Sequence, residues 1–129
     1  MRVLVVEDDH KIGGFLEQGL REEGFEVDRA DDGEEAIAKG GARQYDLILL
    51  DYMLPKKNGL QVTTELRASG VRTPILMLTA RDPGEDAQAS LAAGVSDFVG
   101  KPFRFNDLLG RIRSLVPISG SSGVTSGTP

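Results

Sequence analysis

The segment Val3-Leu4-Val5-Val6, followed directly by Glu7-Asp8-Asp9, is the clearest sign of architecture in this chain. Three further apolar runs end in a similar way: 47–50 before Asp51, 75–78 before Thr79-Ala80, and 98–100 before Lys101-Pro102. Short apolar runs bounded by polar or turn residues are typical of fully buried strands of a parallel sheet. Because parallel strands end at one shared edge, we expect the acids, the hydroxyl and the lysine that follow these runs to converge there.

Helical patterns fill the sequence between these runs, and an alternating segment at 25–30 predicts one more, edge-like strand. The expected helices are 12–23, a short helix opened by Asp32-Gly33 and ended by Gly40-Gly41, one from Asn58-Gly59 to Gly70, and two at about 84–93 and 104–116. Regular alternation of strand and helix implies a parallel sheet with helices on both faces. Five such units are too few for a closed eight-stranded barrel, so we expect an α/β fold with an open, doubly wound, five-stranded parallel sheet.

The bulk composition excludes several classes of protein. The chain has 129 residues, a formal net charge of −5 and no cysteine, which predicts one domain without disulfides or thiolate metal sites. A negative balance argues against a nucleic-acid surface, since such surfaces neutralise phosphates with clustered Lys and Arg. No stretch approaches the ~20 apolar residues of a membrane span, and no signal peptide pattern opens the chain, so we expect a cytoplasmic protein.

The acids at the strand ends predict a metal site. Ligands of doubly wound sheets bind outside the carboxyl ends of the strands, where the winding reverses. In the flavodoxin-like strand order 2-1-3-4-5, taken as the precedent, the first and third strands are neighbours, which brings Glu7, Asp8 and Asp51 into one pocket. Crowded carboxylates raise one another's pKa unless a cation lies between them. Oxygen ligands without Cys or His favour Mg²⁺, Mn²⁺ or Ca²⁺ over zinc or copper.

The charges of this pocket suit phosphoryl transfer. Three carboxylates, one divalent cation and the Lys101 ammonium leave the site close to neutral. A phosphoryl group would therefore be tolerated there, with Asp51 as the nucleophile. Phosphoryl transfer requires mainly positioning and charge stabilisation, and such a pocket would provide both.

Four motifs, in matching order and spacing, resemble the receiver domain of two-component response regulators, the CheY-like superfamily. They are Glu7-Asp8, Asp51-Tyr-Met-Leu-Pro55 with Gly59, Thr79-Ala80, and Asp97-Phe-Val-Gly-Lys-Pro-Phe103. The Lys-Pro-Phe segment and the final helical segment from Asn106 are similar to the OmpR/PhoB-like winged-helix subfamily. The resemblance covers about residues 1–116, so we expect a receiver domain over 1–117. Residues 118–129 are rich in Gly, Ser and Thr and predict a flexible linker or tail.

The resemblance implies a phosphoacceptor and a set of metal ligands. Asp51 would accept a phosphoryl group from a sensor histidine kinase or a small phosphodonor. Asp8, Asp51 and the backbone carbonyl of Met53 would coordinate Mg²⁺, or Mn²⁺ in its place. Glu7 would reach the ion through a water molecule.

The resemblance also implies a switch. Lys101 would bind one phosphoryl oxygen, and the Thr79 hydroxyl would move to donate to another. Phe98 would be the switch aromatic that turns inward when Thr79 moves. Its ring carries no hydroxyl, whereas the family often has tyrosine at this place. The segment Ala93-Gly-Val-Ser-Asp-Phe98 therefore departs from the Ala-Gly-Ala-Asp-Asp-Tyr that is typical of the subfamily.

Members of this subfamily often dimerise through the face formed by the fourth helix, the fifth strand and the fifth helix. Asp97, Arg111 and Arg113 are the candidate charged partners for such a phosphorylation-dependent homodimer, while Ser96 removes one acidic contact. We expect no contact of this domain itself with nucleic acid or membrane. Its output would be the control of an attached DNA-binding domain absent from this chain.

Three other functions are compatible with parts of the pattern. A stand-alone receiver would pass its signal by docking to a protein. A Mg²⁺-dependent aspartyl-phosphate phosphatase would also use an Asp after a strand, but it would want a second Asp where Met53 stands. A flavodoxin-like flavin binder would need a phosphate-cradling Ser/Thr-rich loop where Glu7-Asp8-Asp9 stands. We therefore expect a signalling domain that catalyses only its own phosphorylation and dephosphorylation, rather than an enzyme.

Overall fold

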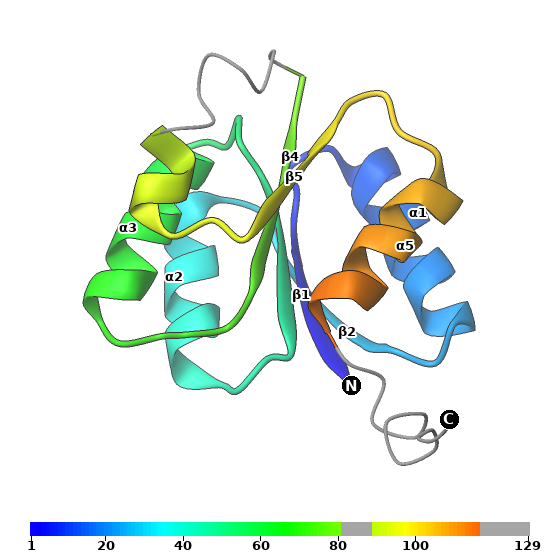
Figure 1. Cartoon of the computed structure of the whole chain (residues 1–129), viewed down its shortest axis with the longest axis horizontal. Helices are drawn as coiled ribbons and strands as arrows, with labels where there is room; N and C mark the ends of the chain where they lie inside the picture. The colour runs from blue at the N-terminus through cyan, green and yellow to red at the C-terminus, as the bar shows by residue number, and fades with distance from the viewer. Residues whose placement is uncertain (81–88, 117–129) are drawn as a thin grey trace.

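The computed structural model describes residues 1–80 and 89–116. Strands and helices alternate along the chain (Figure 1). The strands are β1 (Arg2–Val6), β2 (Glu26–Ala30), β3 (Leu47–Asp51), β4 (Ile75–Thr79) and β5 (Asp97–Gly100). The helices are α1 (His10–Glu22), α2 (Gly33–Ala42), α3 (Gly59–Ala68) and α5 (Phe105–Leu115), and residues 89–93 are also helical.

The sheet is parallel throughout, and its strand order is β2-β1-β3-β4-β5. This order confirms the predicted open, doubly wound α/β architecture. Helices α1 and α5 cover one face of the sheet, and α2 and α3 cover the other (Figure 1). The register pairs Val6 with Leu50 and Thr79 with Gly100, so the strands end beside one another at the carboxyl edge.

Alternation of side chains along the strands divides the core into two halves. Val3 and Val5 of β1 pack in the cluster that contains the apolar residues of α1 and α5. Leu4 and Val6 pack in the cluster that contains those of α2 and α3. Burial of one such side chain contributes about 1.5–3 kcal/mol to the free energy of unfolding. The sheet is therefore a stable support for the loops at its edge.

Three helices begin at the carboxyl edge with a capping side chain. Asp9 caps α1 by accepting two backbone N–H groups, and Asp32 caps α2 by accepting one. At α3, Asn58 and Gln61 form a reciprocal capping box. Each cap satisfies backbone donors that a helix start leaves unpaired, and it fixes where the preceding loop ends.

The structure corrects three details of the sequence prediction. Helix α1 starts two residues before the expected position, at His10, because Asp9 supplies its cap. Helix α2 continues through Gly40-Gly41 to Ala42, and its backbone at Gly40 packs closely against Leu66. Strand β5 is only partly buried, because it is an edge strand with β4 as its single neighbour.

Two further predictions fall partly or wholly outside the described residues. The helix expected at 84–93 is described only from residue 89 onward, and the expected tail at 118–129 is not described. Over residues 1–80 and 89–116, none of the helices has the length and apolar composition that crossing a bilayer requires.

Candidate functional site

The candidate site lies at the carboxyl edge, where four strands end. Glu7 and Asp8 follow β1, and Asp51 is the last residue of β3. Thr79 is the last residue of β4, and Lys101 follows β5. The sheet order therefore brings together residues that are up to 94 positions apart in the sequence.

Glu7, Asp8 and Asp51 form the acidic centre of the site. Each offers one carboxylate oxygen, and these oxygens lie within 4.8 Å of one another. Glu7 and Asp51 are only 1% and 4% exposed, whereas Asp8 is exposed to solvent. A set of hard oxygen ligands, buried on one side and open to water on the other, suits Mg²⁺, which usually keeps several waters. The residues present therefore fit the predicted metal.

Lys101 joins two of these carboxylates. Its Nζ lies 2.9 Å from Asp51 Oδ1 and 3.1 Å from Glu7 Oε1. Its backbone N–H donates to the carbonyl of Thr79 at 2.8 Å, which fixes the lysine at the end of β5 beside β4. The ammonium thus lies directly against the carboxylate predicted to accept the phosphoryl group.

Burial and neighbouring charges perturb two groups of the site. Burial raises the pKa of Glu7 above its ordinary value, and the negative charge of Asp51 adds to this effect against the opposing contacts of Asp9 N–H and Lys101. For Lys101, burial lowers the pKa, but the hydrogen bonds and charges of Asp51 and Glu7 outweigh it, and the pKa is raised. Lys101 is therefore held as an ammonium beside carboxylates that repel one another.

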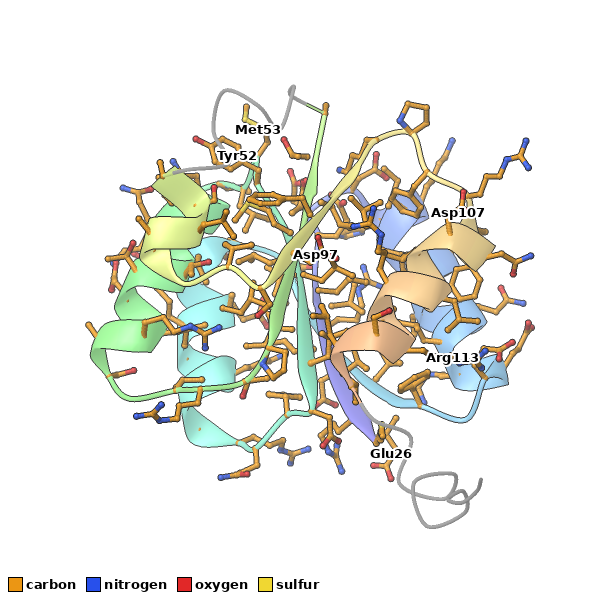
Figure 2. All side chains as sticks on the ribbon, viewed as in Figure 1. Glu26, Tyr52, Met53, Asp97, Asp107 and Arg113 are labelled. Carbon is orange, nitrogen blue, oxygen red and sulfur yellow. The ribbon has the colours of Figure 1, made fainter. Side chains whose placement is uncertain are left out.

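The predicted carbonyl ligand, that of Met53, belongs to the loop between β3 and α3. The two ends of this loop, which form its neck, are joined by a hydrogen bond from Gly59 N–H to Tyr52 O at 2.8 Å. Tyr52 N–H donates to Leu78 O at 2.9 Å, which ties the start of the loop to β4. Figure 2 shows Tyr52 and Met53 at the opposite end of the molecule from Glu26, the first residue of β2, and the Met53 side chain is largely exposed.

The two predicted switch residues lie on adjacent strands. Thr79 is buried at the end of β4. Phe98, on β5, is opposite Met77 in the register and half-buried against the core on the α2 and α3 side. Thr79 thus lies on the strand next to that of Asp51, and Phe98 lies one strand farther from the acidic centre.

Three charged residues proposed for a dimer contact have partners within the chain. Arg111 Nη1 lies 2.9 Å from Asp97 Oδ2, and Arg113 Nη2 lies 2.8 Å from Glu23 Oε1. The sequence pattern did not reveal these pairs, because their members are 14 and 90 residues apart. It also did not reveal that Gly33, at the start of α2, contacts the loop that carries Met53.

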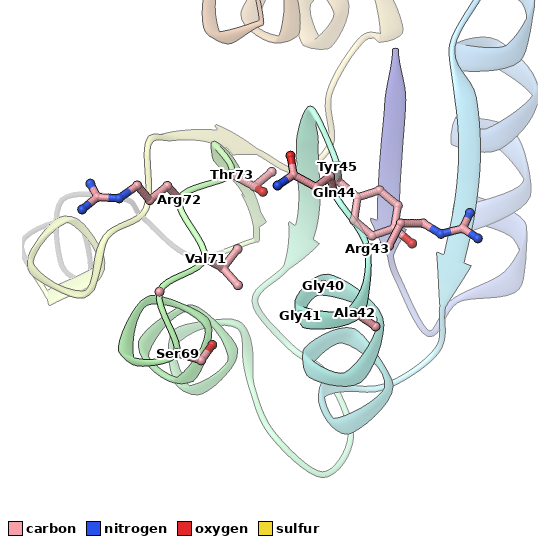
Figure 3. Close-up of a pocket in the computed structure, with 11 residues that line it drawn as sticks. Gly40, Gly41, Ala42, Arg43, Gln44, Tyr45, Ser69, Val71, Arg72 and Thr73 are labelled. Atoms are coloured by element: carbon pink, nitrogen blue, oxygen red, sulfur yellow. The ribbon is translucent and has the colours of Figure 1, made fainter.

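A separate cavity of about 540 Å³ lies at the amino edge of the sheet, between residues 40–45 and 69–73 (Figure 3). The side chains of Arg43 and Arg72 point to opposite sides in this view, so they do not concentrate positive charge in the cavity. None of the candidate site residues lines it.

Several known proteins are similar to this chain. The profile of the response regulator receiver domain matches residues 3–113. The chain is 42% identical over 124 residues to the transcriptional regulatory protein PcoR of Escherichia coli, which covers 96% of this chain and 55% of PcoR. It spans about half the length of the curated relatives it matches, since the share is 51% for the Salmonella typhimurium protein SilR.

Two similar solved structures are described as containing magnesium. One is the receiver domain of the Pseudomonas aeruginosa sensor histidine kinase PA1611, with magnesium in the active-site cleft (TM-score 0.81, 34% identity, 88% of this chain and 95% of that one). The other is the Thermotoga maritima response regulator TrrA in complex with Mg²⁺ and BeF (TM-score 0.80, 36% identity, 89% and 98%). From its fold, its profile match and these relatives, the chain belongs to the family of response regulator receiver domains of two-component systems.

Proposed function

We propose that this domain is a phosphorylation switch in which Asp51 accepts a phosphoryl group from a sensor histidine kinase or from a small phosphodonor. The observation that carries the proposal is the contact of Lys101 with both Asp51 and Glu7, beside Asp8. An ammonium within 2.9 Å of the acceptor oxygen is close enough to bind an oxygen of the transferred group.

Asp8, Asp51 and the Met53 carbonyl would hold Mg²⁺, or Mn²⁺ in its place, and Glu7 would reach it through water. When bound, the ion supplies positive charge that offsets the carboxylates and the phosphoryl oxygens. The similar magnesium-bound receivers and the close approach of the three carboxylates support this assignment.

The chemical step needs only Asp51 as nucleophile. A carboxylate oxygen of Asp51 forms a bond to phosphorus, while the bond from phosphorus to the donor nitrogen or oxygen breaks and the donor keeps that electron pair. Lys101 then moves its contact from the carboxylate to a phosphoryl oxygen. The Thr79 hydroxyl donates to another oxygen, and Phe98 follows Thr79 inward as the output of the switch.

Mass spectrometry after incubation with Mg²⁺ and acetyl phosphate tests the proposal. Wild type should gain the mass of one phosphoryl group, and Asp51→Asn should gain none. Asp107→Asn, which removes an exposed carboxylate from α5 outside the site, should be labelled like wild type (Figure 2). Equal labelling of wild type and Asp51→Asn would refute the assignment of Asp51.

In the cell this switch would act in the cytoplasm as a receiver domain over residues 1–117, joined through the linker at 118–129 to a DNA-binding output domain. The transcriptional regulators among its relatives support this output over a stand-alone receiver that signals by docking. A phosphatase is disfavoured, because Met53 gives no second carboxylate for acid–base turnover. Release of phosphate from an external substrate in many turnovers would favour the phosphatase instead.

We also propose that phosphorylation promotes a homodimer through the face of the fourth helix, β5 and α5. Exposed Leu91 and half-buried Phe98 lie on the described part of this face. Asp97 and Arg111 are partly exposed and already paired, so a dimer would have to exchange this pair between subunits. Gel filtration with and without beryllofluoride tests this: an increase in apparent size supports the dimer, and an unchanged size contradicts it.

A further inference from the structure

The loop between β3 and α3 rests on the first residue of α2. Gly33 N–H donates to Pro55 O at 3.2 Å, and the two residues are 22 positions apart in the sequence. A Cβ atom placed on Gly33 would lie 2.1 Å from the carbonyl oxygen of Lys57 and 2.7 Å from its Cβ. Both distances are shorter than any real contact of a Cβ atom, so only glycine fits while the loop keeps this position.

Charged side chains reinforce the same contact. Lys56 Nζ lies 3.5 Å from Asp32 Oδ2 and 3.8 Å from Glu34 Oε1, the two residues that flank Gly33. Asp32 also accepts the N–H of Glu35 at 2.8 Å and thereby caps α2. Exposed pairs of this kind contribute little energy, so the backbone contact at Gly33 is the main determinant.

The loop is short, and it is held both at its neck and at its tip, residues 55–57. At the neck, Gly59 N–H donates to Tyr52 O, and a Cβ on Gly59 would lie 2.9 Å from Asp51 O. At the tip, Pro55 and Lys57 contact Gly33. Met53 lies between the neck and the tip. A displacement of the tip therefore has little room to be absorbed before it reaches the Met53 carbonyl.

We propose that Gly33 is a positioning residue for the metal site: by allowing α2 to approach the loop, it sets the place of the Met53 carbonyl relative to Asp51 and Asp8. This inference rests on the proposed function, because it takes that carbonyl as a ligand of Mg²⁺. The tertiary contacts of Gly33 are with Pro55 and Lys57 of the loop, and neither of these is a proposed metal ligand. Its effect passes only through the loop.

The substitution Gly33→Ala tests the proposal, with Gly41→Ala as the matched control. Both glycines belong to α2, and neither has a left-handed backbone. A Cβ on Gly41 meets nothing within 4 Å, whereas one on Gly33 collides with the loop. By calorimetric titration with Mg²⁺, Gly33→Ala should bind about tenfold more weakly than wild type, as is usual when the support of a metal ligand is disturbed. Gly41→Ala should bind like wild type.

Phosphorylation by acetyl phosphate distinguishes a misplaced metal ligand from a general loss of structure in Gly33→Ala. Gly33→Ala should need about tenfold more Mg²⁺ for half-maximal labelling, yet approach the wild-type rate at saturating Mg²⁺. An unchanged Mg²⁺ affinity in Gly33→Ala, with wild type binding normally, would overturn this inference and leave the proposed function intact. Failure of wild type itself to bind Mg²⁺ would instead refute the proposed function.

Amide shifts of the wild-type domain keep the proposal testable even when Gly33→Ala does not fold. During titration with Mg²⁺, the amide signals of Gly33 and Met53 should shift together with one dissociation constant, and that of Gly41 should stay in place. A Gly33 signal that does not move while that of Met53 does would contradict the coupling.

Discussion

Two buried hydroxyl groups, Ser90 and Thr63, have opposite surroundings. The Ser90 hydroxyl is buried and has no hydrogen-bond partner among the described residues. The Thr63 hydroxyl is equally buried but donates to Gly59 O at 2.9 Å. A buried hydroxyl without a partner costs free energy, whereas a satisfied one stabilises modestly.

Ser90→Ala is therefore expected to raise the free energy of unfolding by about 1 kcal/mol, because it removes a buried unpaired hydroxyl. Thr63→Val, which keeps the shape of the side chain but loses a satisfied hydrogen bond, should lower it by about 1 kcal/mol. Urea unfolding of both variants measures the two changes. A loss of stability in Ser90→Ala would show that this hydroxyl has a partner in solution.

Tyr45 and Asp28 form a titrating pair near the amino edge. The Tyr45 hydroxyl donates to Asp28 Oδ2 at 2.8 Å. This hydrogen bond, followed by the charges of Arg43 and Arg2, holds the pKa of Asp28 below its usual value against the effect of burial. Burial, followed by the contact with Asp28, raises the pKa of Tyr45 to about 12.

The substitution Tyr45→Phe should change how stability depends on pH. Since the pKa of Asp28 is lower in the folded than in the unfolded state, its contribution is full above about pH 4 and is lost as pH falls through the folded pKa. Tyr45→Phe should therefore lower stability by about 1 kcal/mol at pH 7 and by less near pH 2. Urea unfolding at several pH values measures this difference, and a constant difference would contradict it.

At the scale of elements, α1 shows how a helix rich in glycine is used. A Cβ on Gly13 would lie 2.3 Å from Arg29 Nη2, and Arg29 forms an ion pair with Glu17 of the same helix. A Cβ on Gly19 would lie 2.7 Å from the ring of Phe105, the first residue of α5. The missing side chains thus leave room for the Arg29 guanidinium and the Phe105 ring against α1. This compensates for the weak helix propensity of these positions.

Substitution of Gly14 and of Gly19 by alanine should change the stability of the domain in opposite directions. A Cβ on Gly14 meets nothing within 4 Å, so Gly14→Ala should raise the free energy of unfolding by about 1 kcal/mol through helix propensity alone. Gly19→Ala gains the same propensity but collides with Phe105, so it should lower stability by about 1–3 kcal/mol. Thermal unfolding of both variants separates packing from propensity, and an equal gain in both would disprove close packing at Gly19.

The success of the sequence prediction differed between elements for physical reasons. The inner strands β1, β3 and β4 were predicted because strands buried on both faces need continuous apolar runs. The end of α2 was misplaced because a glycine weakens a helix locally, while packing of Gly40 against Leu66 extends it. At the site, the acids and Lys101 could be predicted because each of them follows or ends an apolar run of the sequence. The contact of Gly33 with Lys57 could not be predicted in this way, because a tertiary contact between the start of a helix and a distant loop has no sequence period.

At the scale of the whole molecule, the fold concentrates like charge at one point. Glu7 and Asp51 are buried, and the ammonium of Lys101 contacts both. Asp8 adds a third carboxylate and has neither a hydrogen bond nor an ion pair within the described part of the chain. Among the described residues of the site, three carboxylates therefore face one ammonium, so a divalent cation that binds only the folded state should stabilise the entire domain.

Mg²⁺ at ten times its dissociation constant should accordingly raise the free energy of unfolding by about 1.4 kcal/mol. Asp8→Ala should be at least as stable as wild type without metal, because Asp8 is exposed and removing its charge relieves repulsion, but it should lose most of the rise on addition of Mg²⁺. Urea unfolding with Mg²⁺, with EDTA, and with NaCl at matched ionic strength measures the effect and separates binding from screening. An equal rise in wild type and Asp8→Ala would show that the stabilising ion binds elsewhere. A rise with NaCl as large as that with Mg²⁺ would show that screening, and not a bound ion, relieves the repulsion among the carboxylates.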